Sequence, residues 1–338
     1  MTTSIDEQIE AAESPGRNRL KSALRFVAGL ALFAIVLRWL APDWNELLAS
    51  VDLDVGWALV GLAGTTAASF VTAARWRLLA EVMGGTKLPF AAYFYGLVVT
   101  RLLGQFTSTV AMDLVGRGAA LRSAGSERGI GHAAMQVVLE RTFDAVLPIL
   151  LLVWALAVRD AWLPVGATLS LALFCLVFMA LAIPLLGPAV RVALRLYLWI
   201  RLRVGKRRRE QLVEAESSFA SAPIVNTKLA AKVATYSVLR FATVVIQFWG
   251  IARAVGIEVS WEQMTAATPF AQLASILGLT PGGLGVIEAG WAGGLGWIGL
   301  SVVSISLFVL AQRVGVIAYF GLLSAISWPL AKREADRD

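Results

Sequence analysis

The sequence predicts an all-α, polytopic membrane protein. Hydrophobic residues make up 58% of its 338 residues, and only 16% are charged. The mean hydropathy of +0.71 is well above that of a soluble domain of similar length. Apolar stretches of roughly 20 residues, the length that crosses a hydrocarbon layer about 30 Å thick, recur along the chain. Together these observations argue against a soluble fold.

About six apolar stretches are long enough to be full spans. The first has Arg25 and Arg38 near its ends, where both side chains can reach the interface. We interpret it as a retained anchor rather than a cleaved signal peptide. The predicted spans cover residues 24–41, 55–74, 130–158, 161–190, 233–253 and 304–331.

Two further segments are predicted to be hairpins of half-length helices. Residues 88–129 lie between basic loops and hold two short apolar pieces, 88–100 and 102–112. Residues 263–300 are interrupted at 280–285 by the sequence TPGGLG. Opposed, interrupted pairs in matching positions suggest an inverted repeat, with two tight pairs of full-length helices as the alternative. Either arrangement predicts a polar interior, because irregular backbone at membrane depth must be buried or line a cavity.

The distribution of lysine and arginine predicts that both termini are cytoplasmic. The first hairpin would then open to the cytoplasm and the second to the exterior. The loops expected outside, 42–54, 159–160 and 253–262, hold zero, one and one basic residues. The segments expected inside hold three (before residue 24), three (75–87), four (101–128), ten (191–232) and three (332–338).

The chain is expected to form a single transmembrane domain over residues 1–338. Its basic segment 191–210 is predicted to lie on anionic lipids of the cytoplasmic leaflet, or to be an ordinary positive-inside loop. The position of this segment beside a span argues against nucleic acid as a partner. The expected order is a tail (1–23), a first half (24–129), central helices with the basic segment (130–232), a second half (233–331) and a tail (332–338).

Composition also limits the chemistry. The chain has one cysteine, Cys175, and one histidine, His132, so neither a disulfide framework nor a common zinc cluster can form. It contains no Gly-rich phosphate loop, HExxH sequence or GxSxG elbow. We therefore expect a protein that is not an enzyme, with no catalytic residue, metal or cofactor.

One predicted span has a polar stripe. His132, Gln136, Glu140 and Asp144 recur at every fourth residue, which places them on one face of a helix. Arg141 is expected to pair with Asp144, three residues further on. Charges within a bilayer are costly and need a partner or a function. We expect this stripe to gate or couple transport, or to form a structural ion-pair network.

Two arginines, Arg240 and Arg313, interrupt otherwise apolar spans in the second half. Their planar guanidinium groups would suit a phosphate. Arg117, with Arg75 and Arg101, is expected at the cytoplasmic mouth of the first hairpin, as a binding group or as a positive-inside anchor. For the two spanning arginines, the alternative is pairing with a carboxylate: Glu140, Asp144 or Glu288.

The most specific motif is TPGGLGVIE at residues 280–288. Its proline would end one half-helix, and Gly282, Gly283 and Gly285 would allow close backbone approach. The helix that follows would present N–H groups and a positive dipole end, which form a cradle for phosphate or carboxylate. Glu288 would repel an anion there, so it is expected to pair with one of the two arginines. A tight helix crossing is the alternative.

Four motifs point to a known family. They are PGGLG followed by Glu288, Glu140–Arg141 with Asp144, Asp113 with Arg117, and Arg75 with Trp76. Over essentially the whole chain, the sequence resembles the lysylphosphatidylglycerol synthase transmembrane region, also called the flippase-like domain. We expect no counterpart of the aminoacyl-transferase domain that some members carry. The chain departs from the family at residues 105–110 (QFTSTV), where a proline–glycine break is usual.

The resemblance implies translocation of an anionic or lipid-linked amphiphile across the bacterial cytoplasmic membrane. The substrate would be a phospholipid or a polyprenyl-phosphate-linked lipid. A secondary transporter of a soluble solute remains an alternative, as does a non-catalytic partner of an envelope-lipid or glycan assembly enzyme. The expected substrate-binding residues are Arg117, Arg240, Gly282, Gly283, Gly285 and Arg313, and the expected gating or coupling residues are Glu140, Arg141, Asp144 and Glu288.

Overall fold

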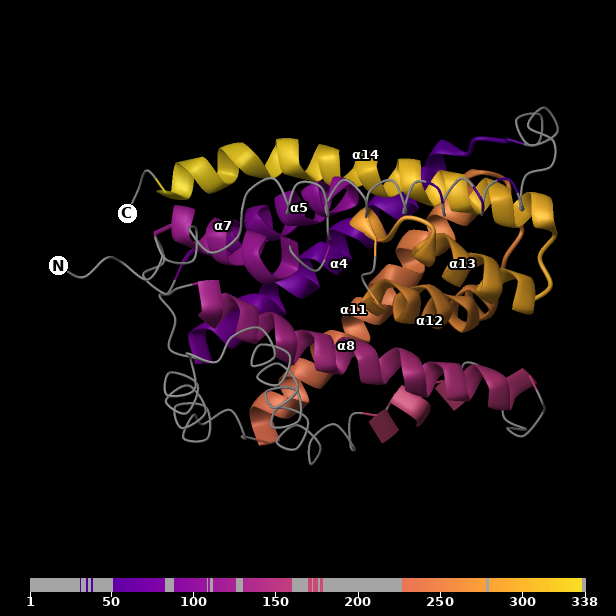
Figure 1. The fold of residues 1–338 in the computed structure, drawn as a ribbon, viewed down its shortest axis with the longest axis horizontal. Helices are drawn as coiled ribbons and strands as arrows, with labels where there is room; N and C mark the ends of the chain where they lie inside the picture. Colours follow the sequence, from indigo (N-terminus) through magenta and orange to yellow (C-terminus); the bar gives the residue numbers. More distant parts are fainter. Residues whose placement is uncertain are drawn as a thin grey trace.

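Helices are the only regular secondary structure in the described part of the chain (Figure 1). The computed structural model describes residues 51–82, 88–107, 109, 112–125, 130–159, 227–277 and 280–335, with isolated positions in 31–38 and 170–178. This confirms the predicted all-α class. The elements are α4 (Val55–Val82), α5 (Phe90–Phe106), η1 (Met112–Gly116), α7 (Arg117–Ser123), α8 (Ile130–Arg159), α11 (Thr227–Ala254), α12 (Trp261–Leu277), η3 (Pro281–Gly283), α13 (Val286–Trp297) and α14 (Val302–Ala335).

Three of the described helices, α4, α11 and α14, are long and apolar enough to cross a membrane. They contain the predicted spans 55–74, 233–253 and 304–331, and each continues beyond the predicted C-terminal end. Aspartate caps the first of them, since the Asp54 carboxylate accepts a hydrogen bond from the Trp57 backbone N–H at 3.1 Å. Figure 1 shows α14 running along the whole length of the molecule.

The fourth long helix, α8, is continuous over 30 residues, as predicted for residues 130–158. Its apolar part is confined to Phe143–Ala157, because the polar stripe occupies its first half. The predicted spans 24–41 and 161–190 lie outside the described residues, apart from isolated positions. The basic segment 191–210 also lies outside them.

Helices α4 and α11 approach closely because glycines lie where they cross. Gly61 and Gly64 of α4 face Gln247 and Gly250 of α11, and a Cβ added at Gly64 would lie 2.5 Å from the Gln247 backbone nitrogen. In lipid, close backbone contact of this kind supplies packing energy that the hydrophobic effect does not. The crossing brings polar residues of both helices together in the interior.

The first hairpin differs from the prediction. α5 is one helix of 17 residues that continues through Arg101, where the sequence suggested a break between two pieces. The Arg101 guanidinium lies 3.7 Å from Asp113, which partly balances its charge within the helix. The second arm is not an apolar half-helix over 102–112, since the chain instead forms the π-helical turn η1, which continues directly into α7.

The second hairpin has its break where the sequence predicts it. α12, of 17 residues, and α13, of 12 residues, are joined through η3 at residues 281–283. At about 1.5 Å per residue α13 is roughly 18 Å long, too short to cross a layer about 30 Å thick. Glycine lets the arms pack, since a Cβ at Gly294 would lie 2.6 Å from the Ala267 carbonyl oxygen.

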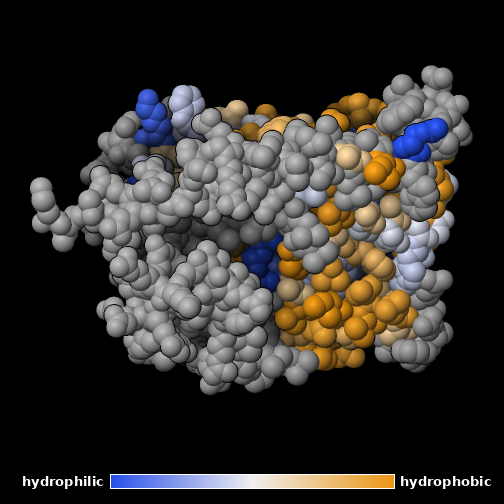
Figure 2. Space-filling model, viewed as in Figure 1, coloured by the Kyte–Doolittle hydropathy of each residue, from blue (hydrophilic) through white to orange (hydrophobic). Residues whose placement is uncertain are grey.

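The described surface exposes many large apolar side chains, while charged side chains are buried in the interior. Phe70, Val153 and Val314 are 55%, 53% and 70% exposed on three different helices. In Figure 2 the coloured part of this face is largely hydrophobic, with hydrophilic residues in a hollow beside it. Arg117 and Glu140 are by contrast only 1% and 2% exposed. This distribution suits a protein surrounded by lipid.

Candidate functional site

Two carboxylates of α8 hold arginines from three other elements. Glu140 lies 2.7 Å from Arg117 of α7 and 3.4 Å from Arg75 of α4. Asp144 lies 2.8 Å from Arg75 and 3.5 Å from Arg240 of α11. Since Arg75 and Arg117 are each 1% exposed, the interpretation of these two as anchors at the cytoplasmic mouth is wrong.

A third carboxylate, Asp113 of η1, holds three further guanidinium contacts. It lies 3.3 Å from Arg117 and 3.7 Å from Arg101, and it accepts a hydrogen bond from Arg141. The predicted pairing of Arg141 with Asp144 is therefore wrong. The two side chains leave α8 in different directions, one toward η1 and the other toward α4 and α11.

These eight residues form one network, which we call the arginine–carboxylate network. Its ion pairs join α4, α5, η1, α7, α8 and α11. Removing one partner of such a buried pair strongly destabilises a protein, so the network fixes the helices relative to one another. The structural role left open for the polar stripe therefore agrees with the geometry. Within the stripe, Gln136 accepts a hydrogen bond from the Trp76 indole at 2.9 Å, and the side chain of His132 is outside the described residues.

A second centre joins the two hairpins. Arg313 of α14 donates from Nε to Glu288 at 2.5 Å, and from Nη1 to the Gly282 carbonyl at 2.9 Å and the Gln105 amide oxygen at 3.0 Å. Glu288 in turn accepts a hydrogen bond from the Gly285 N–H at 2.6 Å. The predicted pairing of Glu288 with an arginine is confirmed, and the partner is Arg313.

The glycine turn is already hydrogen-bonded within the protein. The Gly282 N–H donates to the Thr107 carbonyl at 2.5 Å, and the Gly283 N–H donates to Thr280 at 3.0 Å. Gly282 has a φ of 61°, and a Cβ there would collide with the Gln105 carbonyl oxygen. In this conformation the turn does not offer the N–H groups of Gly282, Gly283 and Gly285 as an anion cradle. It instead allows η3 to pack against the end of α5.

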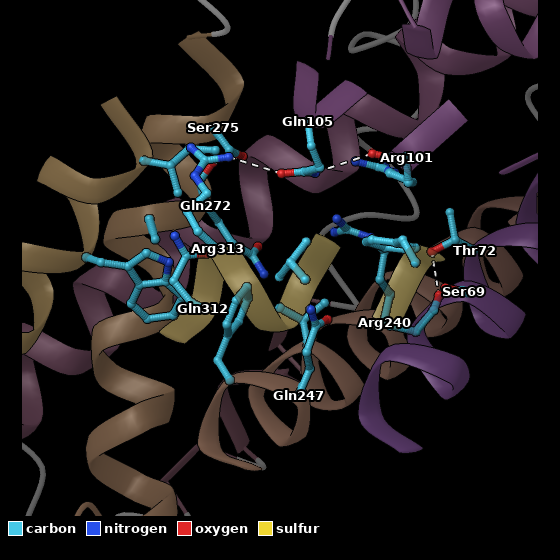
Figure 3. A pocket seen from close by; sticks show the side chains of 18 of the residues that line it. Ser69, Thr72, Arg101, Gln105, Arg240, Gln247, Gln272, Ser275, Gln312 and Arg313 are labelled. Atoms are coloured by element: carbon cyan, nitrogen blue, oxygen red, sulfur yellow. Dashed lines mark hydrogen bonds between the residues drawn. The ribbon is translucent and has the colours of Figure 1, made fainter. Parts of the chain in front are cut away.

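A cavity of about 170 Å³ lies between the two centres, with walls from six helices (Figure 3). No aspartate or glutamate lines it in the part of the chain that the structure describes. Three arginines and four glutamines do. The polar lining consists of Ser69 and Thr72 of α4, Arg101 and Gln105 of α5, Arg240 and Gln247 of α11, Gln272 and Ser275 of α12, and Gln312 and Arg313 of α14.

Four groups of the cavity wall are buried donors without a partner in the described structure. They are Gln272 Nε2, Trp291 Nε1, Gln312 Nε2 and Arg313 Nη2. A buried donor left unpaired costs about 1–3 kcal/mol, so all four favour an acceptor from outside the described residues. A ligand rich in hydrogen-bond acceptors would satisfy all of them.

Part of this site is predictable from the sequence. The cavity brings Arg240 and Arg313 together as predicted, with Gln247 on the same face as Arg240. Arg117, Glu140 and Arg141 do not line it, and neither do the three glycines. Gln105, Gln272, Gln312 and Trp291 were missed, although a glutamine inside an apolar helix was the available signal.

Comparison with known proteins agrees with this architecture. The family model for the lysylphosphatidylglycerol synthase TM region matches residues 26–325. The chain belongs to this family. The match includes both ion-pair centres and every residue of the cavity, and it confirms the resemblance inferred from the motifs. The protein is therefore a membrane protein of the lysylphosphatidylglycerol synthase TM family. No curated protein matches the chain.

Proposed function

We propose that this protein translocates an anionic, lipid-linked amphiphile across the bacterial cytoplasmic membrane. The observation behind the proposal is the cavity, whose described residues offer arginine, glutamine and tryptophan donors and no carboxylate. Such a lining favours a headgroup with negative charge and many acceptor oxygens, as in a phosphate. The apolar outer surface keeps the acyl chains in lipid while the headgroup is inside.

The three arginines of the cavity come from different helices. Arg101, Arg240 and Arg313 belong to α5, α11 and α14, so a bound headgroup would bridge both hairpin regions. Movement of any of these helices would change how well the site fits its ligand. This arrangement supports a transport cycle in which headgroup binding and helix movement are linked.

The contact between the hairpin tips is the proposed gate. Arg313 holds Gly282 and Gln105 through one nitrogen, while its Nη2 atom has no partner in the described structure. A headgroup that binds Nη2 would contact the same guanidinium group that holds the two hairpin tips together. Glu140, Arg141 and Asp144 would couple to the gate indirectly, because their network positions Arg101 and Arg240 beside the cavity.

The remaining parts of the proposal follow from the sequence. The protein acts without catalysis or a cofactor, both of its termini are cytoplasmic, and segment 191–210 binds anionic lipids of that leaflet. Its function does not involve nucleic acid.

A direct test is lipid translocation in liposomes that contain the purified full chain. Fluorescent phospholipids and polyprenyl phosphates are placed in both leaflets, and dithionite is added outside. We expect loss of inner-leaflet protection for at least one anionic lipid, and none in protein-free liposomes. Full protection of every lipid, together with uptake of a soluble anion, would replace the proposal with a solute transporter. Protection of every lipid without any uptake would favour an assembly partner.

A further inference from the structure

The arginine–carboxylate network has more positive than negative charge. Five arginines share three carboxylates, which leaves an excess of two positive charges if all are ionised. No other described carboxylate pairs with these arginines, since Glu288 is held by Arg313 in a pair that is neutral by itself. Uncompensated charge inside a bundle of apolar helices is costly, and a bound anion would balance it.

The excess charge is located at the cavity. Arg75 and Arg117 make ion pairs of 2.8 and 2.7 Å with their carboxylates, within hydrogen-bond distance. Arg101 and Arg240 lie 3.7 and 3.5 Å from theirs and make no side-chain hydrogen bond to any described residue. Both of these weakly paired arginines line the cavity. The other three arginines of the network do not.

The neutral donors of the opposite wall fit the same ligand. Gln272, Trp291 and Gln312 each have an unpaired buried donor, and Arg313 adds a fourth. A terminal phosphate has three non-bridging oxygens and a charge of about −1.5 to −2 at neutral pH. A phosphodiester has two such oxygens and one charge, and it would leave one arginine of the network unbalanced.

We infer that the cavity binds a terminal phosphate, either a monoester or a diphosphate, in preference to a phosphodiester. This rests on the proposed function in so far as the phosphate is attached to a lipid. The phosphate lies between Arg101 and Arg240 on one side and the donors of Gln272, Gln312 and Trp291 on the other. The roughly two negative charges of the terminal phosphate group balance the network, and the preference comes from charge as well as from the number of acceptor atoms.

Two lipids that differ by one methyl group and one charge test the inference. Phosphatidate has a terminal phosphate, and phosphatidylmethanol is its singly charged methyl ester. Binding of each to the full chain in neutral detergent is measured by the change in Trp fluorescence, alongside inorganic pyrophosphate as a soluble phosphate. We expect phosphatidate to bind at least about tenfold more tightly than phosphatidylmethanol.

A pair of variants assigns the preference to the cavity. Arg240→Gln removes the charge of one of the two weakly paired arginines, and we expect it to reduce the preference for phosphatidate severalfold. Arg77→Gln is the matched control, because Arg77 is 41% exposed and pairs with Glu81 away from the network. It should keep the full preference. An unchanged preference in Arg240→Gln, with folding confirmed by its melting temperature, would contradict the assignment.

The remaining results of the binding test distinguish a failure of this inference from a failure of the proposed function. Equal binding of both lipids would overturn the terminal-phosphate inference and leave anionic lipid translocation in place. Binding of pyrophosphate but of neither lipid would support the terminal phosphate and overturn a lipid substrate. Binding of none of the three would overturn both.

Discussion

Arg313 and Glu288 form a buried ion pair that also holds the break in the second hairpin. The Nε atom of Arg313 lies 2.5 Å from Glu288, which is fully buried and accepts the Gly285 N–H through its other oxygen. One carboxylate thus caps α13 and anchors α14 to it. The same guanidinium reaches Gln105 at the end of α5, so the pair connects both hairpins.

Breaking this pair should destabilise the protein. Glu288→Gln leaves the Arg313 charge buried without its counter-ion, and we expect a loss of about 3–5 kcal/mol. Thermal unfolding in detergent would show it as a lower apparent melting temperature. The double variant Glu288→Gln/Arg313→Gln should lose less than the two single variants combined, because the second change removes the unpaired charge. Strictly additive losses would show that the two residues do not interact.

The long helices could be predicted from the sequence, whereas the ion-pair partners of their charged residues could not. α4, α8, α11 and α14 follow from apolar length, and the break before Glu288 follows from proline and glycine. The partner of Arg141 could not be predicted, because local spacing favoured Asp144 and the true partner, Asp113, lies in a π-helical turn. For the same reason Arg75 was placed near the surface. Its burial depends on which helices become neighbours, and no spacing in one segment specifies that.

Gly282 should be sensitive to the smallest substitution. Gly282→Ala places a Cβ against the Gln105 carbonyl at a φ of 61°, so both strain and a clash separate η3 from α5. We expect a destabilisation of at least about 1–3 kcal/mol and altered transport. Gly293→Ala is the control, since a Cβ there meets nothing within 4 Å. The measurement is the melting temperature of each variant, and we expect a lower value for Gly282→Ala than for Gly293→Ala. Equal values would mean that the hairpin tips do not need this contact.

The Gln312 side chain should destabilise the protein without ligand and strengthen the binding of phosphatidate. Its buried Nε2 atom has no partner in the described structure, so Gln312→Leu removes a cost of about 1–3 kcal/mol. We expect a higher melting temperature without ligand and weaker binding of phosphatidate. Val314→Ala, at a position 70% exposed on the same helix, should change neither. A Gln312→Leu protein that binds the lipid normally would remove this side chain from the site.

The crossing of α4 and α11 should depend on its glycines. Gly64→Ala would force a methyl group to 2.5 Å from the Gln247 backbone nitrogen, which the two helices can relieve only by moving apart. We expect a large fall in the melting temperature, because backbone contact provides the packing here. Gly321→Ala is the matched change, as a Cβ there meets nothing within 4 Å, and it should be neutral or slightly stabilising. Similar melting temperatures of Gly64→Ala and Gly321→Ala would contradict the close approach of α4 and α11.

The central claim is that the cavity holds the headgroup while the lipid changes leaflets. Its most direct test is the dithionite assay on liposomes with the wild-type protein, Arg101→Gln, Arg240→Gln and Arg77→Gln, each at equal amounts of folded protein. We expect the two cavity variants to lose at least about tenfold in rate, since each removes a charged partner of the headgroup. Arg77→Gln should match the wild-type rate. Wild-type rates in both cavity variants would contradict the claim and place the lipid path elsewhere.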